Sequence, residues 1–206
     1  MALGVLLMGA MLFLPGLGRT PFGDLDLVYV IPTWMTALAA WRIRGGTSCS
    51  ETLRACIARL RLSGLMLAGL SPFLSWWTRC GDNPYLALNA AYAVGFGVWH
   101  LMEVLMVVRV MADELRLGDI ATMAKRAQSL FVFCLIVPIL AFVLSFALSL
   151  FIYPTTVLAD FHESWADVSG VFRCVIIIPV LNVGRVLWTA HKLLTHAAGQ
   201  RGEKGL

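Results

Sequence analysis

Six long apolar runs are the feature that most constrains how this chain can fold. They cover residues 2–18, 27–41, 62–77, 85–108, 129–153 and 168–190. A helix needs about 20 apolar residues to cross the hydrocarbon core of a bilayer, and the fourth, fifth and sixth runs reach that length. The residue types AVILMFWYC make up 59% of the chain and charged residues only 14%, which excludes a soluble globular domain. We therefore expect an all-α polytopic integral membrane protein, a single transmembrane domain over residues 1–206 with about six transmembrane helices.

The first two runs are short for complete membrane spans. Each contains a proline, Pro15 and Pro32, and neither reaches 20 residues. Two interpretations stay open. The runs 2–18 and 27–41 either cross the bilayer as short helices or form a re-entrant hairpin that returns to its starting side while packed against protein.

The distribution of Lys and Arg predicts how the chain is oriented. The segments 42–61 and 109–128 and the tail 191–206 together carry 12 basic residues, whereas the alternate segments carry only Arg19 and Arg79. Because basic residues collect on the cytoplasmic side, we expect both termini in the cytoplasm of a cell with this protein in its inner membrane. The connection 154–167 has no Lys or Arg, and we expect it to be the outer loop.

Two cytoplasmic connections have helical patterns. Ser48 and Glu51 have the spacing of a capping box, and the apolar residues that follow share one face, so we expect a surface helix over about 48–61. In the second connection Gly118 is a helix stop and Asp119 an N-cap, which predicts a new helix leading into the fifth run.

A few polar residues inside the apolar runs form the candidate site. The fourth run contains Asn89, His100 and Glu103 on one helical stripe, and the sixth contains Asn182 and Arg185. Counted from the outer ends, His100 is level with Asn182, and Glu103 with Arg185. We therefore expect an ion pair between Glu103 and Arg185 with the other pair one turn outward. Three interpretations of this cluster stay open: a solute or proton site, a contact that only fixes two helices in register, or no contact between these residues. A separate alternative for Arg185 is that its side chain extends to the inner headgroups, since it lies near the end of its run.

Other chemistries are not indicated by the sequence. The five cysteines lack CxxC spacing, and the acidic outer loop matches no metal motif, so we expect neither a metal nor another cofactor. The net charge of +4 fits cytoplasmic loops, so nucleic acid is not expected as a partner. The sequence has no GxSxG, HExxH or GxxxxGK[ST] motif, which leaves an enzyme as the least favoured class.

The expected function follows by elimination. We favour a non-enzymatic accessory subunit or scaffold of a membrane complex, with membrane lipids and either a protein partner or a second copy as its contacts. The alternative is a small proton-coupled transporter or channel that uses the polar cluster, and the third is an intramembrane enzyme. Ala87, Ala91 and Gly95 form a small-xxx-small series that allows close helix packing, inside the fold or between copies.

Overall fold

The computed structural model describes residues 27–43, 49–80, 83–137, 140, 144 and 178–193. Every regular element in these residues is helical, which confirms the predicted all-α class. The elements are α2 (Leu27–Arg42), α3 (Glu51–Arg79), α4 (Pro84–Glu114), α5 (Gly118–Phe131), the π-helix η2 (Val132–Ile136) and a helix over residues 178–193. The run 2–18, the outer loop 154–167 and most of the tail lie outside the described residues.

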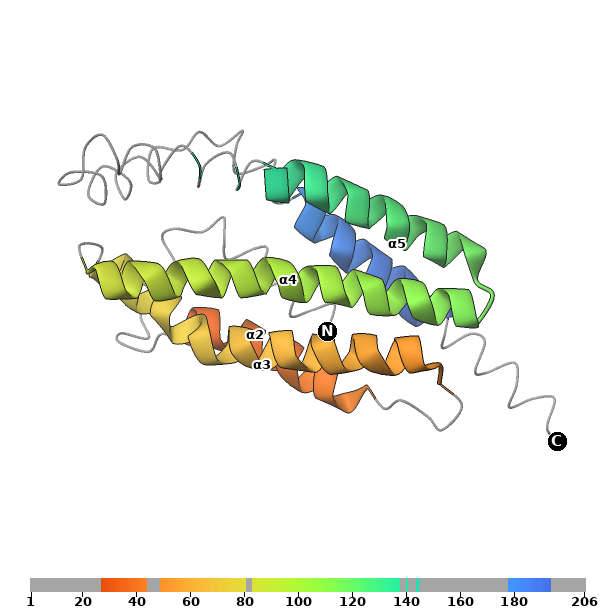
Figure 1. The fold of residues 1–206 in the computed structure, drawn as a ribbon, viewed down its shortest axis with the longest axis horizontal. Coiled ribbons are helices and arrows are strands. Elements are labelled where there is room, and N and C mark those ends of the chain that lie inside the picture. Colours follow the sequence, from red (N-terminus) through yellow and green to blue (C-terminus); the bar gives the residue numbers. More distant parts are fainter. Residues whose placement is uncertain are drawn as a thin grey trace.

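Helices α3 and α4 form a long antiparallel hairpin (Figure 1). Two helices in the described part of the chain are long and apolar enough to cross a membrane, Glu51–Trp77 and Pro84–Glu114. Asn83 caps α4, because its side-chain oxygen accepts hydrogen bonds from the backbone N–H groups of Tyr85 and Leu86. Pro84 then occupies the first helical turn, where the N–H that proline lacks is not needed.

The predicted surface helix over 48–61 is part of a longer element. Helix α3 begins at Glu51, and its N-cap is Ser50, whose hydroxyl accepts from the backbone N–H of Leu53 at 3.1 Å. The helix then continues without a break into the predicted third span. The physical reason is composition, since the residues around 58–62 are Ala, Arg and Leu, all good helix formers, with no Gly or Pro to end the helix.

The turn between α4 and α5 also differs from the prediction. Helix α4 ends at Glu114, and Gly118 is the first residue of α5 rather than the residue that stops α4. The left-handed conformation at this helix end falls on Arg116, with φ 58°. The backbone N–H of Leu117 donates to the carbonyl of Ala112 at 2.8 Å, which closes the end of α4 as a Schellman-type contact does.

The main buried core lies where five helices meet. Side chains from α2, α3, α4, α5 and the helix over 178–193 form one buried cluster, to which α2 contributes Ala40, and Figure 1 shows α5 returning along α4 with the 178–193 helix (blue) behind them. Leu60, Leu105 and Phe131 are wholly buried in this cluster. Helix α2 packs on α3. The outward faces of the helices, by contrast, carry large exposed apolar side chains such as Trp34 and Leu38 of α2.

The π-helix η2 follows α5 directly. Pro138 comes two residues after it in the sequence.

Candidate functional site

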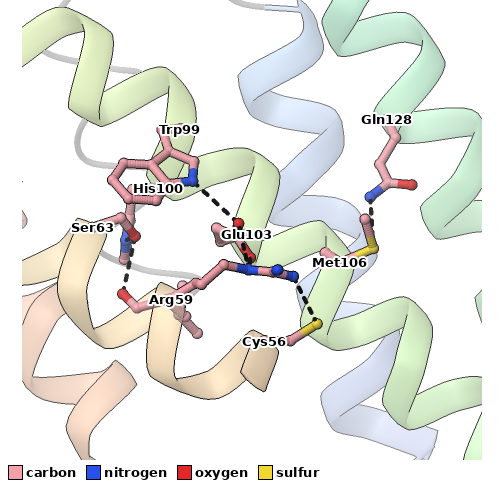
Figure 2. Close-up of polar contacts among 9 residues, drawn as sticks. Cys56, Arg59, Ser63, Trp99, His100, Glu103, Met106 and Gln128 are labelled. Atoms are coloured by element: carbon pink, nitrogen blue, oxygen red, sulfur yellow. Dashed lines mark hydrogen bonds and ion pairs between the residues drawn. The ribbon is translucent and has the colours of Figure 1, made fainter. Parts of the chain in front are cut away.

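His100 occupies the junction of α2, α3 and α4. It lies near the middle of α4, and its side chain is 0% exposed. Its Nδ1 lies 3.0 Å from Oγ of Ser63 on α3, and this hydroxyl also lies 3.1 Å from the carbonyl oxygen of Leu60, to which it donates (Figure 2). His100 is thereby tied to the neighbouring helix through a buried polar contact.

Gly64 allows the three helices to approach one another. A Cβ atom at this position would lie 3.1 Å from Cε1 of His100 and 3.3 Å from the Cα of Ala37 on α2. Both separations are shorter than ordinary van der Waals contact. The imidazole therefore fills the space that a side chain at residue 64 would need, and no room for a solute is left on that side of the ring.

Glu103 forms its ion pair with Arg59. The Nε of Arg59 lies 3.2 Å from Oε1 of Glu103, and Nε1 of Trp99 donates to the same carboxylate oxygen at 3.1 Å. The side chains of Arg59 and Glu103 are 51% and 12% exposed. Nη2 of Arg59 also donates to Sγ of Cys56 at 3.3 Å (Figure 2). This ion pair joins α3 to α4 about one helical turn from His100.

The expected partner of Glu103, Arg185, is placed elsewhere. The buried residues of its helix include Val180, Val183, Val186 and Ala190. At 100° per residue Arg185 lies on the opposite side of the helix, and its side chain is exposed and forms no ion pair within the described residues. Counting depth along two spans compares the levels of two residues but does not fix the direction in which either side chain points.

The other two predicted site residues do not join the cluster. Asn89 donates from Nδ2 to the carbonyl of Tyr85 in its own helix at 2.8 Å. Asn182 is half-buried, and no hydrogen bond from its side chain is found among the described residues. His100 and Glu103 are therefore the predicted site residues that contact a second helix.

Three residues with polar contacts between helices were not predicted from the sequence. Arg59 and Ser63 are two of them, because the candidates came from the fourth and sixth runs and both of these residues lie on α3. Arg61 is the third, since its Nη2 donates to the carbonyl of Ile43 at 2.6 Å and its guanidinium lies 5.6 Å from the ring centroid of Trp41. A cation at the C-terminal end of α2 is favourable because that end carries unsatisfied carbonyls and a partial negative charge.

A serine beside an imidazole is the arrangement of a nucleophile and its base. Here the single hydroxyl hydrogen of Ser63 is donated to Leu60, and both Ser63 and His100 are 0% exposed. A substrate could not reach this hydroxyl without separation of the helices. Within the described residues, no group of three His, Cys, Asp or Glu side chains is arranged to hold a metal ion.

Comparison with known proteins returns no match, since no protein-family model, no curated protein and no solved structure is similar to this chain.

Proposed function

We propose that this chain is a multi-pass inner-membrane protein with about six spans and cytoplasmic termini, and that it acts as a non-enzymatic accessory subunit or scaffold of a membrane complex. The two long apolar helices and the exposed apolar side chains on their outer faces support the membrane placement. The basic segments 42–61 and 109–128 support the orientation.

The hairpin of α3 and α4 has dimensions that suit a bilayer. Arg59 and Trp77 are 18 positions apart on α3, and Tyr85 and Glu103 are also 18 positions apart on α4. At 1.5 Å per residue each arm measures about 27 Å, close to the thickness of the hydrocarbon core. If Trp77 and Tyr85 lie at the outer boundary of the bilayer, the ion pair of Arg59 and Glu103 lies at the inner boundary. At that depth the free-energy cost of placing charged side chains in the membrane is small.

One observation carries the scaffold proposal, namely that the polar side chains of the hairpin, in its buried middle and toward its inner end, are used in contacts between helices. His100 is wholly buried against Ser63 and Gly64, and Glu103 is bound by Arg59 and Trp99. Such contacts hold helices in register. A scaffold needs this rigidity and needs no internal cavity.

The test is native mass spectrometry of the full chain extracted gently from its own membrane, combined with proton-flux measurements in proteoliposomes. We expect a protein partner bound at a fixed stoichiometry and no flux above that of empty vesicles. A chain that carries no partner and moves protons would overturn the proposal. The variant Glu103→Gln serves as the internal comparison, because a scaffold loses stability in this variant whereas a transporter loses flux.

A second candidate, a small proton-coupled transporter, is favoured by one detail of His100. Its Nε2 is buried and has no hydrogen-bond partner within the described residues. An imidazole nitrogen with no partner is a group that can accept a proton. The variant His100→Asn in the same proteoliposomes separates the two candidates, because only a transporter would show a flux that this change abolishes.

A further inference from the structure

One face of the helix over 178–193 is exposed along its whole length. Its exposed stripe consists of positions spaced alternately three and four apart, which share one side of a helix. These residues are Ile178, Leu181, Arg185, Trp188 and Lys192. Val183, Val186 and Ala190, on the other side, are buried in the core. The stripe therefore lies on the side of this helix away from the buried cluster that it forms with the other described helices.

The stripe is apolar at its N-terminal end and carries basic and aromatic side chains toward its C-terminal end. Ile178 and Leu181 are exposed apolar side chains, and Arg185 is an exposed cation that forms no ion pair within the described residues. Trp188 is 56% exposed, and the Nζ of Lys192 lies 5.5 Å from its ring centroid. The side chain of Lys192 thus turns back along the helix toward Arg185. Two cations and an indole are gathered at one end of an otherwise apolar stripe.

We propose that this stripe binds an anionic phospholipid of the inner leaflet. The phosphate lies between Arg185 and Lys192, the indole of Trp188 lies at the level of the glycerol, and an acyl chain follows Leu181 and Ile178. The order apolar, aromatic and basic matches the order of acyl chain, glycerol and phosphate in the lipid. The inference rests on the proposed membrane placement and on its orientation.

Charge complementarity selects this occupant over a partner helix. A transmembrane helix of another protein would have to present a carboxylate to two cations at the edge of the hydrocarbon core, whereas every anionic phospholipid carries its phosphate at that depth. Guanidinium and ammonium groups both bind phosphate, and Arg does so through two parallel N–H donors.

The experiment measures lipid binding by native mass spectrometry of the full chain in micelles that contain equal amounts of phosphatidylglycerol and phosphatidylcholine. We expect the wild type to retain phosphatidylglycerol selectively. The double variant Arg185→Gln/Lys192→Gln should bind it about 30-fold more weakly, since each basic residue near an anionic surface contributes roughly a factor of five. Lys125→Gln/Arg126→Gln, which removes the same charge from the exposed face of α5, is the matched control and should bind as the wild type does.

Three outcomes overturn the lipid site. These are equal retention of phosphatidylcholine, equal loss in the two double variants, and displacement of the lipid by inorganic phosphate at the same concentration, which would indicate a site for free phosphate. Trp188→Leu keeps both cations and should retain selectivity while lowering the number of bound lipids.

Extraction of native membranes with carbonate tests the placement of the protein in the membrane separately. Release of the protein into solution would refute the membrane placement, whereas a retained protein without lipid selectivity would refute only the lipid site.

Discussion

Ser63 and His100 hold each other in defined hydrogen-bonding roles across the interface between α3 and α4. Ser63 has one hydroxyl hydrogen, and it donates this hydrogen to the carbonyl of Leu60. With that hydrogen committed, the contact of 3.0 Å between Oγ of Ser63 and Nδ1 of His100 is satisfied when the imidazole carries its hydrogen on Nδ1 and donates it. In this tautomer Nε2 is an acceptor, and Nε2 is the ring nitrogen found buried without a partner among the described residues.

Removal of the Ser63 hydroxyl should destabilise the hairpin. Ser63→Ala leaves the Nδ1–H of His100 without its acceptor in a buried site, and we expect a loss of about 1 kcal/mol in the free energy of unfolding. Denaturant unfolding in mixed micelles, followed by tryptophan fluorescence, measures the change. Ser129→Ala is the control, because it removes an exposed hydroxyl on α5 that donates to the carbonyl of Lys125 in its own helix. Equal stability of the two variants would contradict the contact.

The two glycines of α3 should respond in opposite ways to substitution. A methyl group added at Gly69 would have nothing within 4 Å, so Gly69→Ala should stabilise the helix by up to about 1 kcal/mol. Gly64→Ala places a methyl group 3.3 Å from the backbone of α2, which cannot turn aside as a flexible side chain can. We expect Gly64→Ala to be less stable than Gly69→Ala, and Gly64→Val to lose about 1–3 kcal/mol. The same unfolding measurement applies, and a Gly64→Val protein as stable as the wild type would show that α2 does not pack here.

The partner of Glu103 can be identified with double-mutant cycles. Glu103→Gln combined with Arg59→Gln should be less destabilising than the sum of the two single changes, because the ion pair is lost only once. Glu103→Gln combined with Arg185→Gln should be additive, since no contact joins these residues. Unfolding free energies of the five variants and the wild type complete both cycles. Coupling in the second cycle and none in the first would restore the pair expected from the sequence.

Arg61 should stabilise the attachment of α2. Arg61→Gln removes a charged donor from the carbonyl of Ile43 and a cation from the ring of Trp41, and we expect a loss of about 1–2 kcal/mol. Arg61→Lys should recover part of this loss, because the charge remains while the planar guanidinium does not. Arg126→Gln on the exposed face of α5 provides the control. A loss no larger than that of the control would mean that Arg61 does not hold the end of α2.

The sequence predicts the elements of this fold better than their contacts. The start of α4 is readable because Asn83 and Pro84 mark it and a long apolar run follows, whereas its end at Glu114 comes before the expected stop at Gly118. The continuity of α3 was missed because a change from amphipathic to apolar composition indicates a change of surroundings, and a helix can pass through both without ending.

For the candidate site too, the sequence predicted the residues better than their contacts. The sequence singled out His100 and Glu103 because polar groups in an apolar run are costly and need partners. It could not supply those partners, since the choice between Arg59 and Arg185 depends on which helix face packs against α4. That choice is made by Val183, Val186 and Ala190, whose burial turns Arg185 outward.

The equal lengths of the two arms of the α3 and α4 hairpin have a mechanical consequence. In a bilayer thicker than about 27 Å, both arms reach their limit together, so a tilt of one arm against the other gives no relief. The lipid around the hairpin must then thin to meet the charged end. In the proposed placement the protein would collect in thin regions of membrane and would impose the same reduced thickness on any protein that assembles beside it.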